Sequence, residues 1–107
     1  MDTQNPFITV KTWRNRNRNK SIESKAGYGI RIKKCDFDKM KNWKILQVGV
    51  DKVERGQKRF TQKCPEIRDY KIGKFLFDNN MNSWKKGKPN LLSLFQIGHE
   101  IYELRIY

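Results

Sequence analysis

Residues 91–107 read LLSLFQIGHEIYELRIY and have the pattern of a β-hairpin. In the second half of this stretch, apolar side chains alternate with Glu103 and Arg105, which is the period of two expected of a half-buried strand. The first half is largely apolar, and Gly98-His99 supplies the residues of a turn. The stretch therefore predicts two antiparallel strands.

Earlier segments of the chain also have strand character. One is rich in β-branched residues, a second alternates so that Ile30 and Ile32 share one face, and a third is apolar on both faces. A fourth, around Phe60, would return from a turn as a partner strand. These segments are residues 7–12, 27–33, 43–53 and 58–62.

Two segments predict helices. Residues 36–41 have apolar side chains three positions apart and an aspartate at their start, enough for one or two helical turns. Pro65 suits the first position of a longer helix that ends near Asn79. The acidic side chains of Glu66 and Asp69 would stabilise the positive N-terminal end of that helix.

The length and the element order together predict the fold class. A chain of 107 residues is long enough for one modest core, so we expect one domain over residues 1–107. Six or seven short strands leave exposed edges unless the sheet closes. We therefore predict a mainly β, α+β fold: a single-domain six- to seven-stranded pseudobarrel with two short helices.

The chain is strongly basic, with 24 Lys and Arg against 11 Asp and Glu and a formal net charge of +13. Lys, Asn and Ile are abundant (16, 9 and 10 residues) and Ala occurs once, the bias of an A+T-rich coding sequence. That bias does not favour the eight Arg, so their placement is more informative. Between Lys11 and Lys34 there are nine basic residues and one acid, Glu23. Such clustering predicts a polyanion partner, and the alternative is a solvated basic surface.

The segment after the first strand is the strongest binding candidate, because arginine alternates with asparagine. Arg makes bidentate contacts to phosphate or guanine, and Asn makes them to adenine. We predict nucleic-acid contacts from Trp13, Arg14, Asn15, Arg16, Asn17, Arg18, Lys20 and Lys25. The alternative is a solubilising loop without a partner.

A second basic segment lies at the turn around Gly56. The glycine would let the backbone approach a ligand closely, and a glutamine beside it could read a base edge. The predicted contact residues are Arg55, Gln57, Lys58 and Arg59, with an ordinary hairpin turn as the alternative. Trp13 and Trp84 have basic neighbours and are candidates for stacking on bases, whereas Trp43 is expected in the core.

Catalytic patterns are weaker, and a small ribonuclease, nuclease or toxin-like enzyme is the alternative function. Asp51, Glu54 and Lys58 are a loose version of a metal-dependent nuclease cluster. His99 beside Glu100 has the chemistry for RNA cleavage, although a lone His in a turn is usually a turn residue. One His and two Cys do not complete a four-ligand zinc site, and we expect no metal and no cofactor.

The chain shows no apolar run long enough to cross a bilayer, and its first six residues are polar. We therefore expect a cytoplasmic protein without a secretory leader and without a membrane partner.

The element order resembles the B-three-type DNA-recognition pseudobarrel of plant transcription factors and of restriction-endonuclease effector domains. The resemblance rests on topology and pattern: the two basic loops, the helix from Pro65 and the turn at Trp84-Lys85-Lys86-Gly87 before the last two strands. It implies seven strands, two short helices and a grip on duplex DNA by two arms, here residues 13–25 and 53–59. Our leading prediction is accordingly a non-catalytic module that binds nucleic acid, with duplex DNA favoured. RNA or an acidic protein is the other possible partner.

Overall fold

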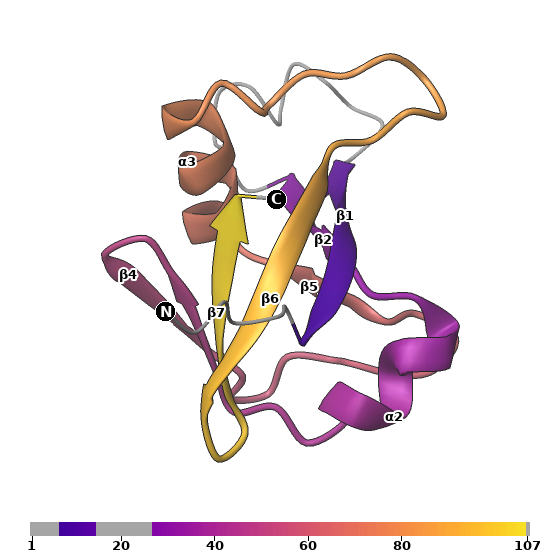
Figure 1. Ribbon diagram of the computed structural model, residues 1–107, viewed down its shortest axis with the longest axis vertical. Helices are drawn as coiled ribbons and strands as arrows, with labels where there is room; N and C mark the ends of the chain where they lie inside the picture. The colour runs from indigo at the N-terminus through magenta and orange to yellow at the C-terminus, as the bar shows by residue number, and fades with distance from the viewer. Residues whose placement is uncertain (1–6, 15–26, 107) are drawn as a thin grey trace, which may run out of the picture.

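The hairpin expected at the end of the sequence lies at the centre of a seven-stranded mixed sheet (Figure 1). The computed structural model describes residues 7–14 and 27–106. The strand order is β4-β3-β7-β6-β1-β2-β5, with β3 parallel to β7 and the other pairs antiparallel. The strands are β1 (Ile8–Arg14), β2 (Tyr28–Arg31), β3 (Ile45–Val48), β4 (Asp51–Glu54), β5 (Glu66–Arg68), β6 (Leu91–Gly98) and β7 (Ile101–Ile106).

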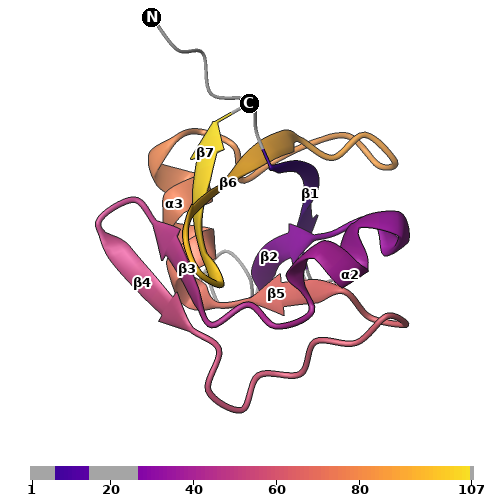
Figure 2. The ribbon, with the colours of Figure 1, turned by 60° about the horizontal axis from the view of Figure 1, so that its bottom comes forward.

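The sheet curls into a half-barrel, which Figure 2 shows from below. Helix α3 (Tyr70–Asp78) packs against β3 and β4 at one end of the strand order and against β2 near the other end, so it covers the open side. A 3-10 turn, η1 (Lys34–Asp36), and a single-turn helix, α2 (Phe37–Met40), connect β2 to β3. The predicted class is therefore confirmed: a mainly β, barrel-like fold with seven strands and two short helices.

The inward faces of the strands and helices form one hydrophobic core. Ile30 and Ile32 are buried together, as their alternation predicted, and Trp43 is 1% exposed, which confirms its expected place in the core. Phe60 stacks on Phe37 with ring centroids 5.2 Å apart and meets Trp43 edge to face. The described residues include no helix of the length and hydropathy that a membrane crossing needs.

One predicted strand is in fact two. Residues 43–53 were expected to form a single buried strand, but β3 and β4 are joined there by a tight turn at Gly49-Val50. Gly49 has a φ of +61°, which a glycine adopts at little cost, and Val50 is 92% exposed at the turn. A valine in the turn gives the segment its continuous apolar appearance.

Two further expectations for the middle of the chain are wrong. Residues 58–62 form no strand, although Phe60 is buried as a core side chain. Pro65 does not begin a helix, because Ile67 pairs with Ile30 and residues 66–68 become the edge strand β5. Helix α3 begins five positions later, after Asp69, whose carboxylate accepts a hydrogen bond from the Lys71 backbone N–H at 2.9 Å.

Candidate nucleic-acid interface

The first strand continues two residues further than its sequence predicts and carries Trp13 and Arg14 into the sheet. Ile8, Val10 and Thr12 are buried, so the alternation of the strand turns Lys11 and Trp13 outward. Trp13 and Arg14, which were expected to start a polar loop, therefore belong to strand β1, and the basic segment begins on this strand.

The register of β1 on β2 places two cations next to each other. Lys11 is directly opposite Arg31, and both side chains are exposed. Like charges at such a cross-strand position repel and destabilise the pair. A polyanion lying over both side chains would remove that repulsion.

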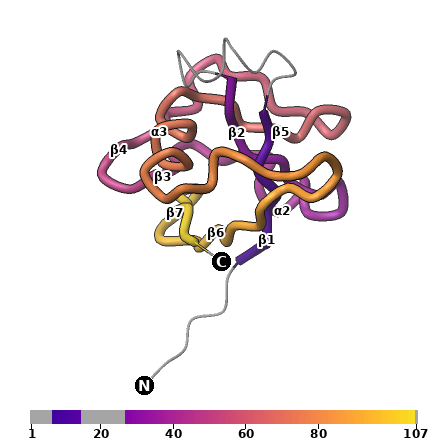
Figure 3. The backbone as a smooth tube through the Cα atoms, turned by 90° about the horizontal axis from the view of Figure 1, so that it is seen from above, coloured from indigo at the N-terminus to yellow at the C-terminus, as the bar shows by residue number. Residues whose placement is uncertain are grey.

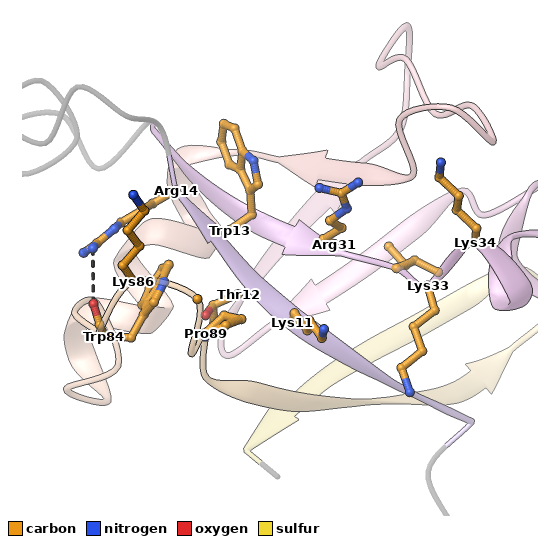
Figure 4. Close-up of a pocket in the computed structure, with 12 residues that line it drawn as sticks. Lys11, Thr12, Trp13, Arg14, Arg31, Lys33, Lys34, Trp84, Lys86 and Pro89 are labelled. Carbon is orange, nitrogen blue, oxygen red and sulfur yellow. Dashed lines mark hydrogen bonds between the residues drawn. The ribbon is translucent and has the colours of Figure 1, made fainter.

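A groove of about 950 Å³ lies over this pair of strands (Figure 4). Half of its described lining residues are basic and none is acidic. In Figure 4, Arg14 and Lys86 lie beside Trp84, and Lys33 and Lys34 lie at the other end. We call this site the basic groove; its lining is Lys11, Thr12, Trp13, Arg14, Arg31, Ile32, Lys33, Lys34, Trp84, Lys86, Gly87 and Pro89.

Arg14 and Trp84 hold one wall of the basic groove in place. The Arg14 guanidinium lies 4.6 Å from the centroid of the Trp84 ring and donates a hydrogen bond to the Trp84 carbonyl at 3.2 Å. Tyr28 also contacts the indole, edge to face, with ring centroids 6.4 Å apart. These contacts fix the segment between α3 and β6, which Figure 3 shows passing over one end of the half-barrel, and they bring Lys86 to the groove.

Trp13 is also engaged by an arginine. The guanidinium carbon of Arg68 lies 4.1 Å from the centroid of the Trp13 ring. Arg68 in turn donates hydrogen bonds to the carboxylate of Glu66, from Nε at 3.2 Å and from Nη2. The same carboxylate lies 3.6 Å from Nη1 of Arg31, so one acid contacts two arginines.

The predicted second arm is divided between structural and free side chains. Arg55 donates to the carbonyls of Lys41, at 2.6 Å, and Trp43, at 3.3 Å, and lies over the Trp43 ring. Lys58 pairs with Asp69 at 3.1 Å. Gln57 and Arg59 are exposed beside them. Arg55 and Lys58 therefore stabilise the fold, and Gln57 and Arg59 are the members of this segment left open to solvent.

Six predicted contact residues lie outside the described part of the chain. They are Asn15, Arg16, Asn17, Arg18, Lys20 and Lys25. Of the described residues nearest to them, Arg14 pairs with Tyr28 in the register of β1 and β2. Arg14 and Tyr28, which lie on either side of this part of the sequence, are therefore neighbours at one end of β1 and β2, and both contact Trp84.

The candidate catalytic residues are distributed over separate contacts. Asp51 pairs with Lys74 at 3.7 Å, whereas Lys58 pairs with Asp69. His99 has an 89% exposed side chain, lies 3.6 Å from Glu100 at the β6–β7 turn and does not line the basic groove. Within residues 7–14 and 27–106, no three His, Cys, Asp or Glu side chains gather in a way that would hold a metal ion.

Several lining residues of the basic groove were not among the predicted contacts. Lys11 and Arg31 occupy outward positions of β1 and β2, and Lys33 follows β2 with the same alternation in the sequence, which could have identified all three. Lys34 and Lys86 give no such signal, because their position at the groove depends on how η1 and the Trp84 segment pack.

Comparison with known protein families, with curated proteins and with solved structures finds no match to this chain.

Proposed function

We propose that this protein is a non-catalytic nucleic-acid-binding module that holds duplex DNA against the basic groove. The observation that carries the proposal is the groove lining: six basic side chains and no described acid over a like-charged strand pair. Lys and Arg that neutralise phosphates release condensed counterions, and this release supplies most of the affinity of such modules.

Both tryptophans of the basic groove already contact other side chains, and this favours a duplex over a single strand as the ligand. Single-strand binders stack bases on free aromatic faces. Here Arg68 covers Trp13, while Arg14 and Tyr28 contact Trp84. Contacts to the phosphate backbone therefore supply the binding, with the tryptophans positioning the arginines.

The segment of residues 15–26 would add sequence readout. It leaves the sheet at the groove, and its Arg and Asn residues can contact base edges once backbone contacts have fixed the register. The resemblance to the B-three-type pseudobarrel remains a prediction, and it too implies binding by two arms. In the second arm, Gln57 and Arg59 are the exposed residues.

The test is a salt series of binding to labelled duplex DNA, single-stranded DNA and RNA. The groove variant changes Lys33, Lys34 and Lys86 to Gln, since these exposed side chains have no hydrogen bond or ion pair within the described residues. The matched control changes Lys41, Lys44 and Lys52 to Gln, which removes the same charge outside the groove. A second variant changes Arg16 and Arg18 to Ala.

We expect wild type to prefer duplex DNA. The slope of log K against log salt is negative, and its magnitude should decrease by about 0.9 for each phosphate that a variant no longer neutralises. The groove variant should leave up to three phosphates without a cation, and the control should keep the wild-type slope. Equal slopes in the two variants would contradict the groove, and a preference for single strands or RNA would overturn the duplex assignment. Cleavage of any substrate that disappears in His99→Ala would favour the ribonuclease.

A further inference from the structure

A second hollow lies along β5 and the loop that precedes it. Its volume is about 710 Å³, and Glu66, the one acid of its described lining, is outnumbered by basic side chains. The lining is Lys58, Arg59, Thr61, Gln62, Lys63, Cys64, Glu66, Ile67 and Arg68. No pattern in the sequence groups these residues, because residues 65–68 have the local features of a helix start.

The basic groove and the second hollow meet at one cluster, the Arg31–Glu66–Arg68 triad. Arg31 lines the groove, and Glu66 and Arg68 line the hollow. The Glu66 side chain is 7% exposed, whereas the side chains of Arg31 and Arg68 are each 51% exposed. The buried carboxylate accepts hydrogen bonds from Arg68 and forms an ion pair with Arg31, so it orients both partly exposed side chains while other guanidinium donors stay open to solvent.

The charge of the triad distinguishes it from a purely structural ion pair. Arg105 offers the comparison: it pairs with Glu103 two positions earlier and lies 4.1 Å from the Phe95 ring centroid, as Arg68 pairs with Glu66 and lies 4.1 Å from Trp13. The Glu103–Arg105 pair is neutral. The triad has two arginines for one carboxylate, so it keeps one positive charge at the junction of two basic surfaces.

We propose that Arg31 and Arg68 clamp one backbone phosphate, and that the bound nucleic acid continues from the basic groove into the second hollow. The inference rests on the proposed function and adds Arg68 and Lys63 to the contact surface, next to Arg59 of the second arm. Phosphate is the ligand that fits, because two guanidiniums bound to the same carboxylate have further N–H donors for its oxygens, and Lys63 and Arg59 of the second hollow provide further positive charge.

The continuation is tested with the double variant Arg59→Gln and Lys63→Gln. Both side chains are exposed and make no ion pair or hydrogen bond among the described residues, so the fold should be kept. The control is Lys52→Gln with Arg105→Gln, which removes equal charge away from both hollows. For duplex DNA we expect the magnitude of the slope of log K against log salt to decrease by about 1.8 in the double variant and to stay unchanged in the control.

The clamp is tested with Arg68→Lys against Arg105→Lys. Lysine keeps the charge and loses the fork, so Arg68→Lys should weaken duplex binding about tenfold while Arg105→Lys leaves it unchanged. Circular dichroism of each variant verifies folding, and the Arg59 and Lys63 double variant decides the continuation whether or not Arg68→Lys folds.

The outcomes separate this inference from the proposed function. If the Lys33, Lys34 and Lys86 variant flattens the slope but the Arg59 and Lys63 variant behaves as its control, the nucleic acid ends at the basic groove and the inference is wrong. If the Arg68→Lys protein folds and binds duplex DNA with wild-type affinity, the proposed phosphate clamp is wrong. A wild-type protein that binds no nucleic acid would overturn both proposals.

Discussion

Trp13 and Arg68 face each other across β2, with the guanidinium carbon 4.1 Å from the indole centroid. The strand register explains how they meet: Gly29 is opposite Trp13 on one side and opposite Arg68 on the other. A Cβ at position 29 would lie 2.3 Å from the Ile67 carbonyl oxygen and 3.0 Å from the Arg68 Cα. The missing side chain therefore permits the close approach of β5 that places Arg68 beside Trp13.

We predict that Gly29→Ala lowers the free energy of unfolding by about 3 kcal/mol, because the new methyl group meets backbone that cannot rotate away. Urea denaturation measures the change. Gly98→Ala is the control, since its Cβ would first meet Ile101 Cδ1 at 3.4 Å, an ordinary contact, and should cost less than about 1 kcal/mol. Equal losses in the two variants would contradict the close approach of β5.

Arg55 should contribute to stability. Removing its guanidinium leaves the Lys41 and Trp43 carbonyls without this donor, so Arg55→Ala should cost about 2 kcal/mol. Gln57→Ala, two positions along and exposed, should change stability by less than about 0.5 kcal/mol. Thermal denaturation compares the two. An Arg55→Ala protein as stable as wild type, with reduced affinity for DNA, would return Arg55 to the binding surface.

Asp69 should be needed for the start of α3. Its carboxylate caps the helix through the Lys71 N–H and also pairs with Lys58. Asp69→Ala removes both interactions and should cost about 1.5 kcal/mol, whereas Asp69→Asn keeps a capping oxygen and should lose less than about 0.5 kcal/mol. Denaturation followed by far-ultraviolet circular dichroism measures both. If Asn loses as much as Ala, the ion pair rather than the cap holds the helix start.

The sequence was informative where side-chain period and burial agree. The β6–β7 hairpin, the inward Ile30 and Ile32 and the buried Trp43 follow from alternation and hydrophobicity. It was uninformative where tertiary pairing prevailed over local preference. Pro65 and the acids after it favour a helix locally, but the free backbone edge of β2 captures residues 66–68 as a strand.

The same division applies to the candidate site. The clustering of Arg in the sequence predicts a binding segment at residues 13–25, and strand alternation predicts that Lys11 and Arg31 point outward. The junction at Arg68 could not be predicted, because it depends on β5 lying beside β2 and on Gly29 leaving room.

The ionisation of the Tyr102 phenol should measure how strongly this side chain is buried in the core. Burial raises the pKa of the Tyr102 phenol above the usual tyrosine value, and the Glu100 carboxylate raises it further. The native state thus holds this proton more tightly than the unfolded chain does. The resulting stability is fully present below the pKa of an unfolded tyrosine, about 10, and is lost as the pH rises through the native pKa.

Alkaline titration of phenolate absorbance in wild type and Tyr102→Phe isolates this group, and its midpoint should lie above that of free tyrosine. Tyr70→Phe, at an exposed position, controls for the loss of one hydroxyl. Tyr102→Phe should also cost about 1 kcal/mol at neutral pH, because the Lys39 carbonyl loses its hydrogen bond from the phenol. A midpoint at or below that of free tyrosine would contradict the burial.

The pair Lys11 and Arg31 predicts a conflict between stability and binding. Lys11→Glu replaces a repulsive cross-strand pair with an attractive one, so the free protein should gain about 0.5 kcal/mol. The same change puts a negative charge into the basic groove and should weaken duplex binding more than the neutral Lys11→Gln does. The control is Lys52→Glu on β4, where the opposite residue is Gln47 of β3. It changes the net charge by the same amount and should neither raise stability nor weaken duplex binding. Chemical denaturation and a salt series on the same preparations test both effects. A Lys11→Glu protein that is more stable and still binds like wild type would show that the repulsion between Lys11 and Arg31 serves no ligand in this groove.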